Sequence, residues 1–289
     1  MDELDFSSTS PKPVPKPATP PPAPTPPSAQ YKPAVALQFF RAAGQVEEVA
    51  GGKSFFAEND KPGGFFSGGS RLYLLLEGDV GLMAKGHFLG NIKPGDIFGE
   101  IAMLARAPRT ASAMAKVNSK AISLDEKQFH SALKKIPEFA LMMMAVMVHR
   151  LRQNMARQAP GAAGAVVERE AVFNKKELVA FADEIAPVRA AAGKTIMTAG
   201  DTGVFMYVVH DGKVAISVNG KVVERVGPGG VFGEMALVDN AQRAATATAE
   251  VPAELMLVKR SDFLSLIKVK PEFGASILRT IAERIRALT

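Results

Sequence analysis

The residues best suited to chemistry lie in two similar segments, which we call the first cassette (98–112) and the second cassette (232–246). Each begins with Phe-Gly-Glu, an apolar residue and Ala, and each has an Arg nine residues after the Glu. Backbone N–H groups at a helix start donate hydrogen bonds to anions, and a guanidinium pairs well with phosphate. We therefore expect each cassette to hold a compact anion that carries one negative charge.

The repeat extends well beyond the cassettes. Phe98 and Phe232 are separated by 134 positions (232 − 98), and the same offset relates Tyr73 to Tyr207, Gly78 to Gly212, Arg109 to Arg243, and Arg150 to Arg284. Upstream, the first copy carries extra residues around 59–70, which we interpret as a longer loop between strands. An internal repeat of this length predicts two domains of one fold.

Short segments rich in β-branched and aromatic residues surround each cassette. In the first copy they lie at 53–56, 71–76, 79–83, 87–92 and 113–124, and Gly punctuates them. Such spacing is typical of a β-sandwich or barrel. Residues 34–43 are expected to be helical, as are residues 125–157, with a break at Pro137 because its ring removes a backbone donor.

Two stretches are predicted to lie outside the domains. Residues 11–27 contain ten prolines, so we expect residues 1–33 to form a disordered, extended tail. This tail is interpreted as a spacer, and the alternative is a ligand for the aromatic groove of another protein. Pro and Gly mark a linker at 159–170, which gives domains at 34–158 and 171–289.

The cassettes and their surroundings resemble the cyclic-nucleotide-binding domain family, a jelly-roll module found in bacterial catabolite regulators, cyclic-nucleotide-dependent kinases and gated channels. The first copy carries the resemblance in Gly95-Asp-Ile-Phe-Gly-Glu-Ile-Ala-Met and Pro108-Arg-Thr-Ala-Ser. The second carries it in Gly200-Asp-Thr-Gly, Tyr207-Val-Val-His-Asp-Gly, Gly233-Glu-Met-Ala-Leu and Arg243-Ala-Ala-Thr. The resemblance implies a mainly β fold with flanking helices, arranged as two tandem jelly-roll β-barrels.

The resemblance also implies a ligand, cAMP or cGMP, and roles for individual residues. In each copy the Arg would pair with the cyclic phosphate, the Glu would accept from the ribose 2′-hydroxyl, and small residues would let the backbone approach. The predicted ligand-binding residues are Gly99, Glu100, Ala102, Arg109, Thr110, Gly233, Glu234, Ala236, Arg243 and Ala244. The structural alternative is a salt bridge of each Arg inside its own domain, for which Glu100 and Glu234 are candidate partners.

The two copies differ beside the predicted phosphate arginines. Thr110 follows Arg109, whereas Ala244 follows Arg243. In the kinases that the chain resembles, a hydroxyl here is associated with cGMP and Ala with cAMP, although channels that respond to cAMP also carry Thr. The base preference of each site therefore stays open. Leu151 and Met155 are candidate lids over the base in the first domain, with ordinary core residues as the alternative.

Composition excludes several classes of function. The chain has no Cys, so disulfides, iron–sulfur clusters and thiolate zinc sites are excluded. The longest apolar run, 139–148, is about half of what a membrane-spanning helix needs, so we expect no membrane span and a cytoplasmic location. The net charge of +6 is scattered, and the arginines near 149–157 and 279–286 are expected on solvated helix faces.

No catalytic or metal-binding motif is apparent, so we expect a protein that is not an enzyme. The leading hypothesis is a cyclic-nucleotide sensor that transmits binding through helix movement to an unknown protein effector. One alternative is a transcription regulator without its own DNA-binding domain, since no residues for a recognition helix follow the second barrel, and direct DNA binding is not expected. The other alternative is a degenerate scaffold that binds no nucleotide.

Overall fold

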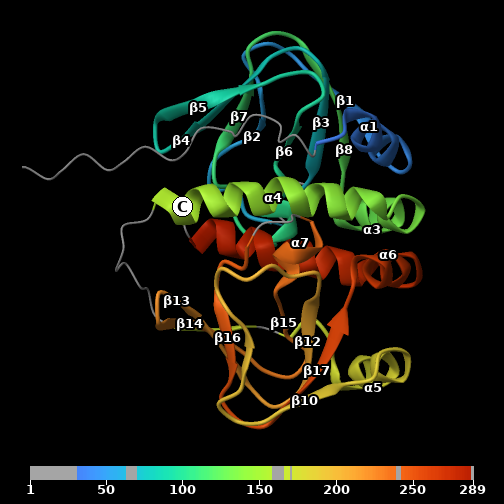
Figure 1. Ribbon diagram of the computed structural model, residues 1–289. Coiled ribbons are helices and arrows are strands. Elements are labelled where there is room, and N and C mark those ends of the chain that lie inside the picture. Colours follow the sequence, from blue (N-terminus) through green and yellow to red (C-terminus); the bar gives the residue numbers. More distant parts are fainter. Residues whose placement is uncertain (1–30, 63–69, 158–165, 170, 239–241, 288–289) are drawn as a thin grey trace, which may run out of the picture.

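Two β-sandwiches with helices between them make up the computed structural model (Figure 1). The structure describes residues 31–62, 70–157, 166–169, 171–238 and 242–287. Most of the predicted tail, and residues 159–165 and 170 of the predicted linker, lie outside the described residues.

The first sandwich contains two antiparallel sheets, with strand orders β1-β8-β3-β6 and β2-β7-β4-β5. Its strands are β1 (Gln45–Val49), β2 (Ser54–Phe56), β3 (Leu72–Glu77), β4 (Val80–Ala84), β5 (His87–Ile92), β6 (Ile97–Phe98), β7 (Ser112–Ala115) and β8 (Ser119–Leu124). Side chains alternate across β3, so Tyr73 and Leu75 pack between the sheets while Leu72 and Leu74 pack against the helices. The strand is therefore buried on both faces.

The second sandwich repeats this plan, with orders β10-β17-β12-β15 and β11-β16-β13-β14-β9. Its strands are β9 (Val167–Arg169), β10 (Val188–Ala190), β11 (Thr195–Met197), β12 (Met206–Asp211), β13 (Val214–Val218), β14 (Lys221–Val226), β15 (Val231–Phe232), β16 (Thr246–Ala249) and β17 (Ala253–Val258). Strand β9 lies in the predicted linker 159–170 and pairs in parallel with β14. The end of that segment thus extends a sheet, which its composition did not indicate.

The helices are α1 (Pro33–Arg41), α2 (Glu100–Leu104), α3 (Glu126–Lys135), α4 (Glu138–Arg157), α5 (Lys175–Glu184), the 3-10 helix η1 (Glu234–Leu237), α6 (Arg260–Val269) and α7 (Pro271–Ala287). Helix α3 begins at a capping box in which Asp125 and Gln128 each accept the other's backbone N–H. The predicted break at Pro137 is confirmed, because α3 ends before it and α4 begins after it.

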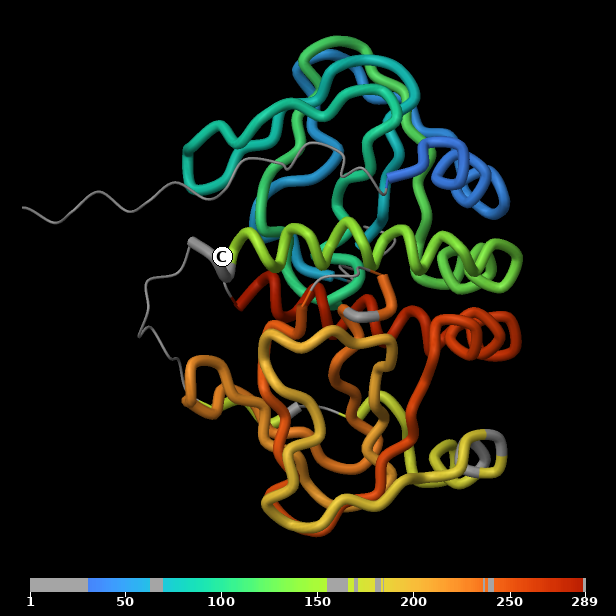
Figure 2. Tube along the Cα trace, in the orientation of Figure 1, coloured from blue at the N-terminus to red at the C-terminus, as the bar shows by residue number. Residues whose placement is uncertain are grey.

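Helices α4 and α7 lie side by side between the sandwiches (Figures 1 and 2). One hydrophobic core combines buried residues of both halves of the chain, among them Phe139 of α4 and Ile281 of α7. At Gly274 a β-carbon would stand 3.6 Å from that of Ala140, so the two helices approach closely there. The tandem jelly-roll arrangement is confirmed, and its two halves share a core.

Residues 31–33, predicted as the end of the tail, belong to the folded part. The Tyr31 hydroxyl donates to the Gly95 carbonyl oxygen, and the Lys32 N–H lies 3.3 Å from the Met142 sulfur. Helix α1 then begins at Pro33, whose fixed φ suits a first helical position. The chain is therefore anchored to the first domain before α1 starts.

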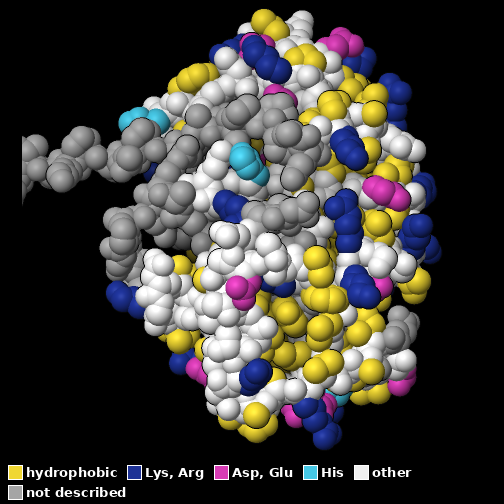
Figure 3. Space-filling view, viewed as in Figure 1, with side chains coloured by type: hydrophobic (Ala, Val, Ile, Leu, Met, Phe, Trp, Pro, Cys, Tyr) yellow, Lys and Arg dark blue, Asp and Glu magenta, His cyan; other side chains and the backbone are white. Residues whose placement is uncertain are grey.

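Charged side chains are dispersed on the face that Figure 3 shows, where Lys and Arg are spread over both sandwiches and Asp and Glu lie among them. Within the part of the chain that the structure describes, no helix combines the length and apolar character that crossing a membrane requires.

Candidate functional site

The first cassette begins at a glycine whose backbone is left-handed. Gly99 has φ 77° and lies immediately before α2, and no side chain caps this helix. A β-carbon at Gly99 would stand 2.7 Å from Nη1 of Arg109. Both the positive φ and the close guanidinium therefore require glycine.

The Arg109 side chain is buried against the cassette, with 5% of the residue exposed. It donates from Nη1 to the Gly99 carbonyl oxygen and from Nη2 to the Arg71 carbonyl oxygen, each at 2.9 Å, and its guanidinium lies 4.0 Å from the Phe56 ring centre. Burial lowers the pKa of Arg109, but an arginine stays protonated at neutral pH. The other three N–H groups of its fork have no partner among the described residues.

The second cassette has the same geometry. Arg243, which is 8% exposed, donates from Nη1 to the Gly233 carbonyl oxygen at 3.0 Å and from Nη2 to the Phe205 carbonyl oxygen at 2.8 Å. Both acceptors lie 134 positions after those of Arg109. Gly203 also contributes, because a β-carbon there would stand 2.2 Å from Nε of Arg243. Gly203 belongs to the motif Gly200-Asp-Thr-Gly, which by itself predicted no contact with the arginine.

Each cassette carboxylate pairs with an arginine of the helix that follows its sandwich. Glu100 binds Arg150 at 3.1 Å, and Glu234 binds Arg284. The alternative of a salt bridge between Arg and Glu of one cassette is therefore wrong among these residues.

The expectation of solvated helix faces is wrong for these two helix arginines. The Arg150 and Arg284 side chains are only 27% and 23% exposed. Each helix turns that side chain toward its own cassette, where a carboxylate compensates the charge. Their recurrence at the offset of 134 was the available signal.

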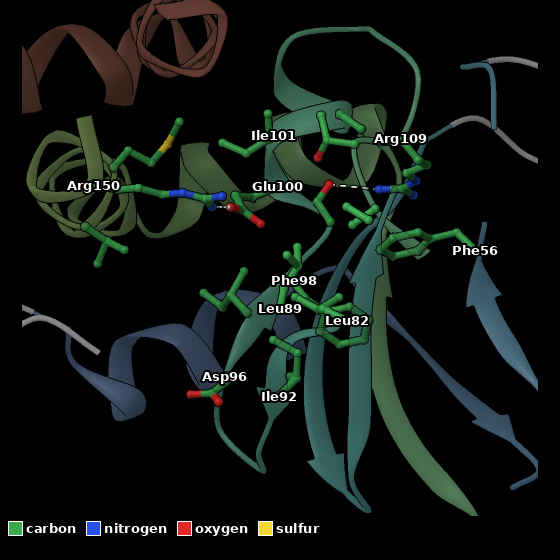
Figure 4. A pocket seen from close by; sticks show the side chains of 18 of the residues that line it. Phe56, Leu82, Leu89, Ile92, Asp96, Phe98, Glu100, Ile101, Arg109 and Arg150 are labelled. Carbon is green, nitrogen blue, oxygen red and sulfur yellow. Dashed lines mark hydrogen bonds and ion pairs between the residues drawn. The ribbon is translucent and has the colours of Figure 1, made fainter. Parts of the chain in front are cut away.

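A cavity of about 370 Å³ opens beside the first cassette. The predicted residues Gly99, Glu100, Ala102, Arg109 and Thr110 all line it. Figure 4 shows Arg109 and Asp96 well apart on its wall, with Glu100 beside Arg150. This volume falls in the range of small-molecule sites, about 300–1,000 Å³. The first cassette therefore borders a cavity that can hold a nucleotide-sized anion.

The second cassette borders a much smaller cavity, of about 50 Å³. Gly233, Glu234, Arg243 and Ala244 line it, while Ala236 lies in η1 and its side chain is outside the described set. Arg152 of α4 also lines it and donates to the Gln242 carbonyl oxygen at 3.2 Å. A residue of the first domain thus helps to close the second site, which is smaller than small-molecule sites generally are.

Of the two candidate lids, Leu151 does not line the first cavity and is a core residue, as the alternative had it. The side chain of Met155 is outside what the structure describes. Instead Met143, Val146 and Met147 of α4 line the cavity. The residues of this helix that line the cavity thus lie one to two turns before the candidate lid Leu151.

The fold and these sites define a class of protein, a tandem pair of jelly-roll sandwiches in which each cassette presents a buried arginine. The family model "Cyclic nucleotide-binding domain" matches residues 47–135 and 187–270. The chain belongs to this family. The predicted fold and the predicted ligand class, a cyclic nucleotide, are both confirmed.

Individual relatives fall within the same family. The chain is 28% identical over 187 residues to a cAMP-dependent protein kinase regulatory subunit of Schizosaccharomyces pombe, covering 63% of this chain and 41% of that protein. It is 36% identical over 99 residues to the cyclic AMP receptor protein of Thermus thermophilus, covering 32% and 46%. The chain thus spans less than half the length of each of these relatives. A solved structure, the regulatory domain of Toxoplasma gondii PKA with cAMP, matches at 21% identity and a TM-score of 0.29, covering 83% and 86%.

Proposed function

We propose that this protein is a non-catalytic sensor of cAMP or cGMP that passes the binding signal to a protein partner. The observation that carries the proposal is the buried Arg109, which donates to the Gly99 carbonyl oxygen beside a cavity of about 370 Å³. The same hydrogen bond joins Arg243 to Gly233. A regulatory role agrees with what the two relatives are, a protein kinase regulatory subunit and a cyclic AMP receptor protein. The sensor domains are proposed to span 34–158 and 171–289.

In the first site the free N–H groups of Arg109 would bind the exocyclic oxygens of the cyclic phosphate. Glu100 would accept a hydrogen bond from the ribose 2′-hydroxyl, so its carboxylate would be shared between Arg150 and the ligand. Gly99 and Ala102 leave room for the backbone of α2 to approach the phosphate. Thr110 is exposed on the cavity wall, where its hydroxyl is available to a base.

In the second site Arg243 and Glu234 would have the same roles, with Gly233, Ala236 and Ala244 as the small residues. A cavity of about 50 Å³ does not hold a nucleotide, so this site must open before it binds. Opening would separate the second cassette from α4, which packs against η1. We therefore propose that the first site fills first and the second binds more weakly.

The signal would travel through contacts that cross between the domains. Helix α2 of the first cassette packs against α7, and Arg279 of α7 donates from Nε to the Leu104 carbonyl oxygen at 3.3 Å. A ligand that shifts α2 thereby acts on a helix of the second domain. The effector, the role of the Pro-rich tail and the expected lack of DNA binding stay predictions.

Isothermal titration calorimetry with cAMP and with cGMP tests the proposal. A charge-assisted hydrogen bond is worth about 1.5–3 kcal/mol, so Arg109→Ala should weaken the tight site at least tenfold. The control is Arg106→Ala in the same cassette, whose exposed side chain binds Glu126 instead of lining the cavity. Equal affinities of the wild type and Arg109→Ala would refute the assignment.

The base preference requires its own variant. Thr110→Ala gives the first site the residue that the second has at Ala244, so the ratio of cGMP to cAMP affinity should fall if the Thr hydroxyl binds guanine. An unchanged ratio would show that the preference is set elsewhere on the wall.

A further inference from the structure

A side chain from outside the first sandwich forms part of its cavity wall. Tyr31 precedes α1 and lines the cavity of about 370 Å³. Its hydroxyl donates to the Gly95 carbonyl oxygen, at the turn that leads into β6 and the first cassette. Burial, reinforced by Asp96, raises the pKa of Tyr31, so the ring is neutral at physiological pH. A neutral aromatic ring therefore stands in the wall.

The position of Tyr31 matches the place of the nucleotide base. Gly95, its hydrogen-bond acceptor, is the neighbour of Asp96, which Figure 4 shows well apart from Arg109. In a ligand whose phosphate lies at Arg109, the base is the far end and lies away from the arginine. The ring of Tyr31 is therefore near the region where a base would lie.

The other aromatic residues of the described wall are already engaged. Phe56 lies 4.0 Å from the guanidinium of Arg109, at the phosphate end. Phe98 is buried between the sheets and stacks on Tyr73, with ring centres 5.0 Å apart. Tyr31 is thus the described aromatic side chain best placed for a base.

The second domain satisfies the equivalent carbonyl in another way. Gly229, 134 positions after Gly95, accepts from the backbone N–H groups of Val172 and Phe173 at 2.7 and 3.0 Å. The Phe173 ring points into the shared core, where it lies 5.2 Å from the Phe273 ring, and it does not line the small cavity. Among the described residues, the partner of this glycine carbonyl is therefore an aromatic residue of the cavity wall in the first domain but not in the second.

We propose that Tyr31 is a base-contacting residue of the first site, which packs its ring against the purine of the bound cyclic nucleotide. The inference rests on the proposed function, because it needs a nucleotide in this cavity. In this proposal the residues just before α1 are part of the first ligand site, and the second site has no equivalent among the described residues.

The test uses the full chain with Arg243→Ala as background, so that titration with cAMP, cGMP and cUMP reports the first site. By analogy with aromatic–base stacking, Tyr31→Ala should weaken purine binding roughly 5- to 100-fold, while Tyr31→Phe keeps the ring and stays within about threefold. The loss should be smaller for cUMP, because a pyrimidine offers less ring area. The control is Leu37→Ala. Leu37 lies in α1, the helix that Tyr31 precedes, but it packs against the core and does not line the cavity.

Fluorescence supplies a second measurement, since the chain has three Tyr and no Trp. Purine binding should change tyrosine emission in the background protein, and Tyr31→Phe should remove much of that change without loss of affinity. The inference is overturned if Tyr31→Ala binds as the background does, or if it and Leu37→Ala weaken purine and pyrimidine ligands equally. Binding that does not depend on Arg109 would instead refute the proposed function itself.

Discussion

Substituting Gly99 by Ala should impair both folding and binding, and Gly86 provides a matched control. Both glycines have φ 77°, so an alanine at either position adopts a left-handed backbone that costs roughly 1–2 kcal/mol. Nothing lies within 4 Å of a β-carbon at Gly86, whereas one at Gly99 would stand 2.7 Å from Nη1 of Arg109 and 3.0 Å from the Arg71 carbonyl oxygen. The difference between the variants therefore reports the close contacts at Gly99, of which the one with Arg109 is the shortest.

The added methyl must displace the guanidinium from its two carbonyl acceptors. Hydrogen bonds of a charged group contribute about 1.5–3 kcal/mol, so Gly99→Ala should be less stable than Gly86→Ala by about that amount. Its affinity for cyclic nucleotide at the first site should fall at least tenfold, while Gly86→Ala binds as the wild type does. Thermal unfolding and calorimetric titration measure the two effects. Equal stability and equal affinity of the two variants would refute the argument that Gly99 is required by Arg109.

Two further predictions concern ion pairs. Glu234 is 1% exposed, so Arg284→Met removes a charged partner from a buried carboxylate and should destabilise the protein by about 1.5–3 kcal/mol, the worth of a hydrogen bond to a charged group. Arg150→Met, beside the more exposed Glu100, should cost clearly less, and equal shifts in the unfolding midpoint would contradict this. The hydrogen bond from Lys270 lowers the pKa of Glu177 in the folded protein. The pair therefore stabilises the protein fully at pH values above the unfolded-state pKa of about 4.3. This stabilisation is lost as the pH falls through the lower pKa of the folded state. Glu177→Gln should therefore be less stable by about 0.5 kcal/mol at pH 7, and denaturation curves should show the gap closing toward pH 3.

Repetition made much of the fold and the candidate site predictable. Gly99 is as far from Arg109 in the sequence as Gly233 is from Arg243, which favours the same backbone geometry in both cassettes. In the structure the two arginines donate to equivalent pairs of carbonyl oxygens. The break at Pro137 followed from local chemistry alone. These features depend on short segments, so one sequence was sufficient to predict them.

Features that depend on packing between distant elements were not predictable. Arg150 and Arg284 lie in arginine-rich helix ends, which are typical of solvated surfaces. They form ion pairs because each helix packs against its cassette. The two cassettes share Phe-Gly-Glu and the Arg nine residues later, yet the first borders a cavity of about 370 Å³ and the second one of about 50 Å³, which Arg152 of α4 also lines. Tyr31 follows a Pro-rich stretch and gave no sign of reaching Gly95.

Equilibrium dialysis of labelled cAMP and cGMP against the full chain tests the central claim, two cyclic-nucleotide sites in one protein, most directly. With the preferred nucleotide at saturation, the account predicts two bound per chain in the wild type, with a tight site that Arg109→Ala removes and a weaker one that Arg243→Ala removes. The double variant should bind neither nucleotide. A single site, or binding that survives in the double variant, would contradict the account.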